Sequence, residues 1–120
     1  MDTLLFREYC LSKAHTSESL PFDDETLVFK LNGKMFALLD LDKGQSCNLK
    51  CDPERAIELR ERFDGIIPGY HMNKMHWNTV FFDRDVNDKL ICELIDHSYD
   101  LIMKNFSAKI RKELLGGSSD

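Results

Sequence analysis

The segment Leu27–Leu41, LVFKLNGKMFALLDL, decides the fold because it predicts a β-hairpin. Asn32-Gly33 at its centre tolerates the two positive φ angles of a type I′ turn, whose twist matches the flanking strands. A two-residue loop then fixes the register on one face, which pairs Leu31 with Lys34, Phe29 with Phe36 and Leu27 with Leu38. Strands 27–31 and 34–41 therefore begin an antiparallel sheet.

Further strands extend this sheet. Gln45–Cys51 alternates between a face with Cys47, Leu49 and Cys51 and a face with Ser46, Asn48 and Lys50, as a half-buried strand does. Ile66-Ile67 and Trp77–Phe82 are rich in β-branched and aromatic residues, which favours two more strands. Ser19–Phe22 is expected as a short edge strand that Pro21 limits.

Along the chain, predicted helices precede, interrupt and follow the predicted strands. Thr3 or Asp2 caps a first helix that ends near Ala14, and Asp52-Pro53 begins a second that ends near Phe63. Asp85 is expected to cap the longest helix, which ends near Asn105, and Ser107 caps a short last one. This order predicts an α+β two-layer sandwich, in which an antiparallel sheet carries its helices on one face. We expect a single domain over residues 1–115 and a flexible tail over 116–120.

Composition limits the class of protein. The net charge is −5, whereas a protein that depends on phosphate contacts is usually basic on at least one face. The sequence has no apolar run of the roughly 18 residues that a membrane span needs, and its start does not resemble a signal peptide. We expect a cytoplasmic protein without a membrane partner. The four cysteines form no CxxC pair and are expected as free thiols.

The segment 68–80, PGYHMNKMHWNTV, is the strongest candidate for binding chemistry. Residues 65–82 contain no Asp or Glu, although the chain is acidic overall. Lys74 could pair with a phosphate, amides could bond to base edges, and aromatic rings could stack on bases. The candidate nucleic-acid-binding residues of this segment are Tyr70, His71, Asn73, Lys74, His76, Trp77 and Asn78. Alternatively, Trp77 anchors the core and the polar side chains satisfy the loop backbone.

Two alternatives concern neighbouring surfaces. Lys30, Asn48 and Lys50 extend the nucleic-acid site if their strands present them on one outward face, where Met35 lies opposite Lys30. A different reading makes this a non-enzymatic module that binds a protein or a small ligand. Its apolar anchors would be Tyr70, Met72, Met75 and Trp77.

Catalysis and cofactors have little support in the sequence. It contains no GxSxG, P-loop, GxGxxG or HExxH motif, and its His and Cys residues lack the spacing of a metal site. The acidic run Asp23-Asp24-Glu25 is more simply a polar turn before a strand. We therefore predict no enzyme, no catalytic residue, no cofactor and no metal.

Three stretches together resemble the MmcQ/YjbR family over nearly the whole chain. They are Cys51-Asp52-Pro53-Glu54 with its helix, the segment 68–80, and Leu94–Leu101. The resemblance implies a two-layer fold like that of CyaY, the frataxin-like arrangement, and a predicted DNA-binding role with double-stranded DNA as partner. Met75 stands where the family pattern often has Lys or Arg, which removes one cation from this chain.

Overall fold

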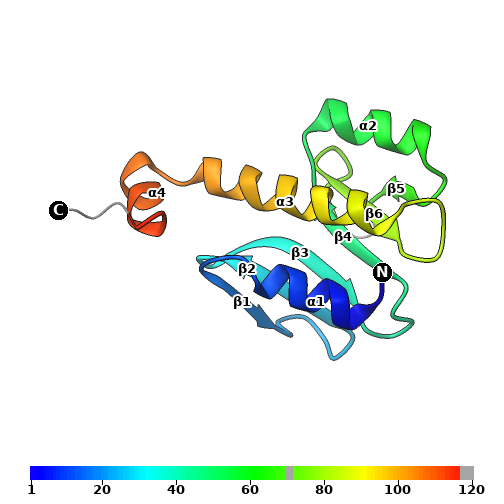
Figure 1. Ribbon diagram of the computed structural model, residues 1–120, viewed down its shortest axis with the longest axis horizontal. Coiled ribbons are helices and arrows are strands. Elements are labelled where there is room, and N and C mark those ends of the chain that lie inside the picture. Colours follow the sequence, from blue (N-terminus) through cyan, green and yellow to red (C-terminus); the bar gives the residue numbers. More distant parts are fainter. Residues whose placement is uncertain (70–71, 117–120) are drawn as a thin grey trace.

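The computed structural model describes residues 1–69 and 72–116, and one open six-stranded sheet forms its centre (Figure 1). All neighbouring strands are antiparallel, in the order β1-β2-β3-β4-β6-β5. The strands are β1 (Thr16–Ser19), β2 (Thr26–Leu31), β3 (Lys34–Asp40), β4 (Ser46–Lys50), β5 (Ile66–Pro68) and β6 (Trp77–Phe81). The predicted meander and the two later strands are confirmed.

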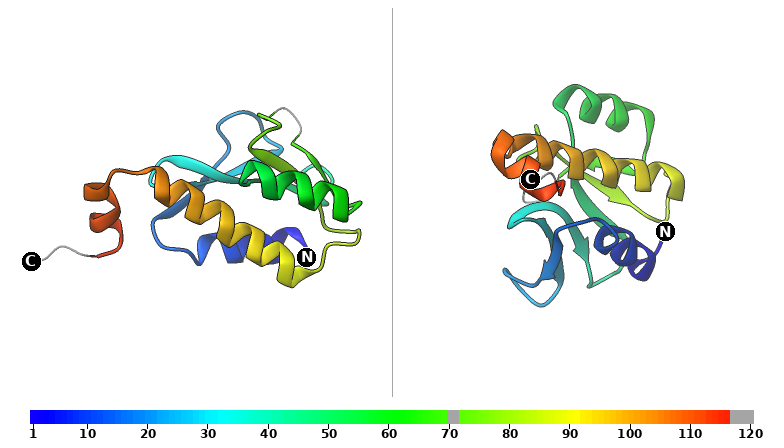
Figure 2. Two further views of the ribbon diagram at one scale, coloured as in Figure 1. Left: turned by 90° about the horizontal axis from the view of Figure 1, so that it is seen from above. Right: turned by 60° about the vertical axis from the view of Figure 1, so that its left-hand side comes forward.

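The helices pack on one face of this sheet, which confirms the predicted α+β class. They are α1 (Thr3–Leu11), α2 (Pro53–Arg62), α3 (Asp88–Asn105) and α4 (Ala108–Leu114). Figures 1 and 2 show α1 and α3 side by side across the same face of the sheet. The main core lies between these layers and joins side chains such as Phe6 of α1, Phe36 of β3 and Ile95 of α3. The opposite sheet face has only a small apolar cluster of its own, formed by Val28, Leu38 and Trp77.

The hairpin turn forms as predicted, but the register of its strands differs. Asn32 and Gly33 have φ angles of 47° and 86°, as the type I′ turn requires. Lys30 pairs with Met35, and then a bulge shifts the register, so that Phe29 pairs with Ala37 and Val28 with Leu38. The predicted pairs Phe29 with Phe36 and Leu27 with Leu38 are therefore wrong. The extra residue allows both Phe36 and Ala37 to enter the core.

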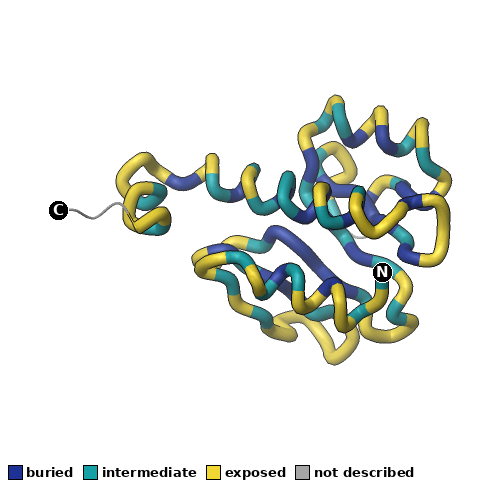
Figure 3. Tube along the Cα trace, in the orientation of Figure 1, coloured by how far each residue is buried: buried dark blue, intermediate teal, exposed yellow. Residues whose placement is uncertain are grey.

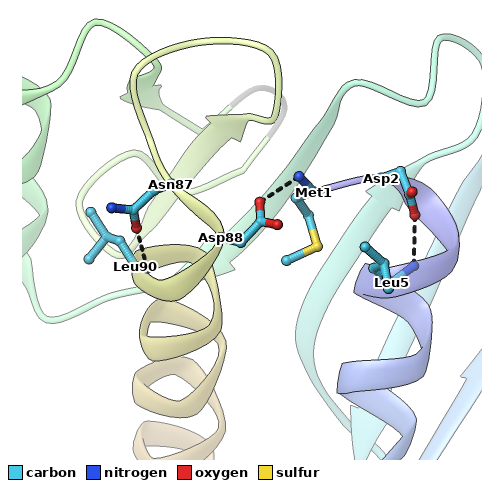
Figure 4. Close-up of polar contacts among 6 residues, drawn as sticks. All are labelled: Met1, Asp2, Leu5, Asn87, Asp88 and Leu90. Carbon is cyan, nitrogen blue, oxygen red and sulfur yellow. Dashed lines mark hydrogen bonds and ion pairs between the residues drawn. The ribbon is translucent and has the colours of Figure 1, made fainter.

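Several element boundaries differ from the predictions. The first strand occupies Thr16–Ser19 instead of 19–22, and α1 ends at Leu11. Asp85 does not cap α3, because its carboxylate accepts hydrogen bonds from the backbone N–H groups of Asp64 and Gly65. Asn87 is the cap, and its side chain accepts the N–H of Leu90 at 2.8 Å (Figure 4).

The N-terminal ends of α1 and α3 lie beside each other in the helical layer (Figure 4). Asp2 caps α1 by accepting the N–H of Leu5 at 2.8 Å. The Met1 ammonium lies 2.5 Å from a carboxylate oxygen of Asp88, in the first turn of α3. Over residues 1–69 and 72–116, no helix combines the length and apolar character that crossing a membrane requires.

Candidate ligand-binding face of the sheet

The segment between β5 and β6, described at Gly69 and at residues 72–76, is a loop with several hydrogen bonds of its own. The N–H of Gly69 donates to the carbonyl of Trp77 at 2.9 Å, and the carbonyl of Asn73 accepts the N–H groups of His76 and Trp77 at 3.2 and 3.0 Å. The Asn73 side chain accepts the N–H of Met75 at 2.9 Å. A Cβ on residue 69 would lie 3.0 Å from the Trp77 carbonyl oxygen, which is a tight contact, so this approach favours glycine. Tyr70 and His71, also predicted as site residues, lie outside the described residues.

Arg60 of α2 anchors this loop from the helical side. Its Nε donates to the side-chain oxygen of Asn78 at 2.6 Å, and its Nη2 donates to the carbonyl of Lys74. The Asn78 amide nitrogen donates in turn to the carbonyl of Ala56 at 3.4 Å. Asn78 is only 2% exposed, so its amide holds α2 to β6 and is not presented to a base edge. Sequence reasoning missed Arg60, because nothing in the sequence distinguishes it from the other arginines of α2.

Trp77 is buried on the sheet face that lacks helices. It is 8% exposed, and Val28, Leu38, Met35 and Met72 pack around it. Its ring is therefore not presented for stacking on a base. Lys74 is exposed but donates from Nζ to the carbonyl of Gly69 at 3.2 Å. His76 is half-buried, and its carbonyl accepts the N–H of Cys51 at 2.8 Å.

The register of the sheet brings Lys30, Asn48 and Lys50 to this helix-free face. Lys30 and Lys50 share a row with Met35 and Trp77. Asn48 lies in the next row, between Leu38 and Thr79, and accepts the Thr79 hydroxyl at 2.7 Å. A third row carries Thr26, Asp40, Ser46 and Phe81. The face therefore changes from basic to acidic along the strands, with an apolar and amide row between its ends.

A hollow of about 880 Å³ covers the middle and acidic rows of this face. The loop at residues 20–25 and the loop before β6 both rise on the side away from α1 and α3 (Figure 2). They form its walls with Phe22 on one side and Met72 and Asn73 on the other. Phe22 is 64% exposed, and the whole of its loop is exposed (Figure 3). The floor is formed mainly by Met35, Leu38, Asn48, Thr79 and Phe81.

The charged side chains that line the hollow are mostly acidic. Asp23, Asp40 and Asp42 contribute carboxylates, and Lys43 contributes one ammonium group. A hydrogen bond from the N–H of Glu25 holds the pKa of Asp23 below its usual value, so this carboxylate is ionised at neutral pH. Within residues 1–69 and 72–116, no Lys, Arg or His lies within ion-pair distance of any of these three carboxylates.

Other clusters lead less directly to a site. A second hollow of about 660 Å³ lies between α2 and the start of α3, where Arg55 and Arg62 alternate with Glu58, Glu61 and Glu93. Among the described residues, no group of three His, Cys, Asp or Glu side chains could hold a metal ion. Cys10, Cys47 and Cys51 are buried free thiols, and burial raises the pKa of each.

Comparison with known proteins places the chain in a family. A sequence model described as YjbR matches residues 11–101. The chain is 35% identical to the uncharacterised protein YbdF of Escherichia coli O157:H7, over 81% of this chain and 80% of that protein. It is 30% identical to the uncharacterised protein YjbR of Escherichia coli K12, over 90% and 92% of the two chains.

Solved structures agree with these sequence relationships. The crystal structure of Deinococcus radiodurans protein DR2400, a DUF419 domain, is 42% identical and superposes with a TM-score of 0.88, over 100% of this chain and 97% of that one. The crystal structure of a Pseudomonas syringae protein is 32% identical with a TM-score of 0.72, over 84% and 98%. This chain therefore belongs to the YjbR family.

Proposed function

We propose that this protein is a non-enzymatic binding module that holds a small ligand in the hollow of its helix-free sheet face. The observation that supports the proposal is a hollow of about 880 Å³ with apolar walls, on a sheet face that no described helix covers. Small-molecule sites typically measure about 300–1,000 Å³ and combine apolar walls with a few polar groups. Phe22, Leu38 and Met72 supply apolar surface, while Asn48 and Thr79 supply polar atoms.

The lining also supports a binding role over a catalytic one. Among the described residues, the lining contains Thr26, Ser46 and Thr79 as hydroxyl groups but no His or Cys. The Thr79 hydroxyl donates to the amide oxygen of Asn48, which is not a base strong enough to activate it. The side chains are thus suited to orienting a ligand by hydrogen bonds.

The alternative partner, double-stranded DNA, is less compatible with the charges of this surface. Phosphates require cations, and the hollow places Asp23, Asp40 and Asp42 where a phosphate backbone would approach. Lys30 and Lys50 lie in the opposite row, outside the hollow, and Trp77 and Asn78 are buried. The distribution of charge therefore favours a small ligand over a duplex.

The test is a titration of the protein with naphthylmethanol, a neutral aromatic probe, followed by backbone amide NMR shifts. We expect the largest shifts at residues 22–26, 38–48 and 72–81. Phe22→Ser should weaken binding about threefold to tenfold, because it removes one apolar wall. Leu4→Ser is the matched control, since Leu4 is 60% exposed on α1, far from the hollow, and its loss should leave the affinity unchanged.

Two results would overturn this proposal. The first is the absence of localised shifts with the neutral probe and also with charged probes of the same ring system. The second is a titration with a short duplex of random sequence that shifts the amides of residues 72–78 and weakens steeply with added salt. The second result would return the function to nucleic-acid binding.

A further inference from the structure

The balance of charge in the hollow indicates the class of its ligand. We infer that the occupant is a small organic cation with an apolar body, which enters the hollow with its charged group toward Asp40 and Asp42. This inference rests on the proposed function, because it assigns a ligand class to the same hollow.

The geometry separates an apolar part of the hollow from an acidic part. Asp40 lies in the row of Thr26, Ser46 and Phe81, and Asp42 lies two residues after the end of β3. Leu38 lies one row nearer to Trp77, and Met72 packs against that tryptophan. A ligand that spans the two rows therefore contacts apolar side chains at one end and carboxylates at the other.

The acidic part carries more negative than positive charge. Besides the three lining carboxylates, Asp24 and Glu25 lie in the same exposed loop as Asp23. Lys43 in the lining opposes them, and so does Arg84 beside Phe81, where the guanidinium lies 4.1 Å from the ring centroid. Hydrogen bonds from the N–H groups of Gly65 and Asp64 are the main cause of the lowered pKa of Asp85, and Arg84 lowers it further, so part of the charge of Arg84 is compensated. The remaining excess is negative and attracts a cation.

The hydrogen bonds of the carboxylates keep them in place without neutralising them. One oxygen of Asp23 accepts the N–H of Glu25 at 2.9 Å, and one oxygen of Asp40 accepts the N–H of Asp42 at 3.0 Å. Both bonds come from neutral backbone groups, which fix the orientation of the carboxylates without cancelling their charge. Hydrogen bonds from an ammonium group to an ionised carboxylate are charge-assisted and stronger than bonds between neutral groups. The exposed ring of Phe22 provides an additional surface on which a cation could lie.

Three probes that share one ring system test the assignment. Naphthylmethylammonium carries a positive charge, naphthylmethanol is neutral, and naphthoate carries a negative charge. We expect the cation to bind roughly tenfold more tightly than the alcohol at low salt, and the anion more weakly than the alcohol. Raising NaCl from about 20 mM to about 500 mM should remove most of the difference, because exposed charges are screened.

Variants then locate the effect. The double variant Asp40→Asn with Asp42→Asn keeps side-chain oxygens as acceptors but removes two charges, so it should abolish most of the preference for the cation. Lys43→Gln should change the preference in the opposite direction and strengthen cation binding. Asp100→Asn is the control, because Asp100 is exposed on α3 in the helical layer and should not affect any probe.

The outcomes separate this inference from the proposed function. If all three probes bind the hollow with equal affinity, the cation assignment is wrong while the binding module stands. If none binds, the proposed function itself fails. A preference for the cation that persists in the Asp40 and Asp42 double variant also overturns the assignment, because another part of the surface then supplies the charge.

Discussion

Replacing Arg60 should show how far the stability of the protein depends on the hydrogen bonds by which this arginine holds the loop before β6. In Arg60→Met, the hydrogen bonds to the buried oxygen of Asn78 and to the carbonyl of Lys74 are both lost. Hydrogen bonds to charged groups contribute about 1.5–3 kcal/mol each, and a buried acceptor without a partner costs about 1–3 kcal/mol. Methionine retains most of the aliphatic packing. We therefore expect the free energy of unfolding to fall by about 2–4 kcal/mol, which is a large part of the total for a domain of this size.

The measurement is urea unfolding followed by the fluorescence of Trp77, the only tryptophan in the chain. Because Trp77 is buried, we expect a blue-shifted emission in the native protein. This emission also reports on the loop that Arg60 holds. Arg62→Met is the matched control, because Arg62 is exposed on the same helix and its guanidinium lies 5.6 Å from the centroid of the Phe63 ring. The control should lose about 1 kcal/mol or less. Equal losses in the two variants would refute the anchoring role.

A double-mutant cycle refines the interpretation. Combining Arg60→Met with Asn78→Ala removes the orphaned acceptor together with its donor, so the double variant should lose less stability than the sum of the two single losses. Simple additivity would mean that the bond between Arg60 and Asn78 contributes little.

Three further predictions concern stability. Gly69→Ala should cost about 1–3 kcal/mol and shift the Trp77 emission, because the new Cβ would lie 3.0 Å from atoms of that residue; unchanged stability and emission would contradict the close approach. Burial, with a smaller effect of Arg55, lowers the pKa of His97 from 6.5, and its neutral Nε2 accepts the N–H of Asp52. Since the pKa of His97 is lower in the folded than in the unfolded protein, the stabilisation by neutral His97 is complete above pH 6.5 and is lost as the pH falls through the folded pKa. The urea midpoint, measured at several pH values, should therefore decline at acidic pH. His97→Gln should reduce this pH dependence. Ser98→Ala should cost about 1–3 kcal/mol, because this fully buried hydroxyl accepts the N–H of Lys50 and donates to the carbonyl of Phe36; a thermal unfolding midpoint equal to that of the unmodified protein would refute this.

Local sequence signals predicted most of the fold. The Asn32-Gly33 turn, the alternation along Ser46–Lys50 and the caps at Asp52 and Ser107 all lead to the observed elements, because each depends on residues close in sequence. The bulge after Phe29 could not be predicted in this way. It arises because the core accommodates both Phe36 and Ala37, and the strand pattern alone does not show how two layers fit together.

The start of α3 shows the same limit. Asp85 and Asn87 are both good helix caps, and the choice between them depends on Asp64 and Gly65, which lie about twenty residues earlier. The likeness to CyaY stays a prediction.

The candidate site was predicted in part. The sequence identified the loop before β6 and the shared outward face of Lys30, Asn48 and Lys50, and the register confirms that these three lie on one face. It did not identify the hollow, because Phe22 and Asp42 reach it from loops that only the folded sheet brings near Met72. A buried Trp77 was one of two alternatives, and its exposure depended on how side chains of β2 and β3 pack with it across the sheet, where β4 separates β3 from β6.

The residues that support the loop before β6 are separate from the residues that line the proposed ligand site. Arg60, Gly69 and Asn78 hold the backbone from beneath, while the side chains of Phe22 and Met72 stand at the walls above. The exposed Phe22 can therefore be exchanged at little cost to folding. Because the supporting and lining residues are separate, protein engineers could change the ligand selectivity without altering the fold. Related chains could diverge in ligand preference through the same substitutions.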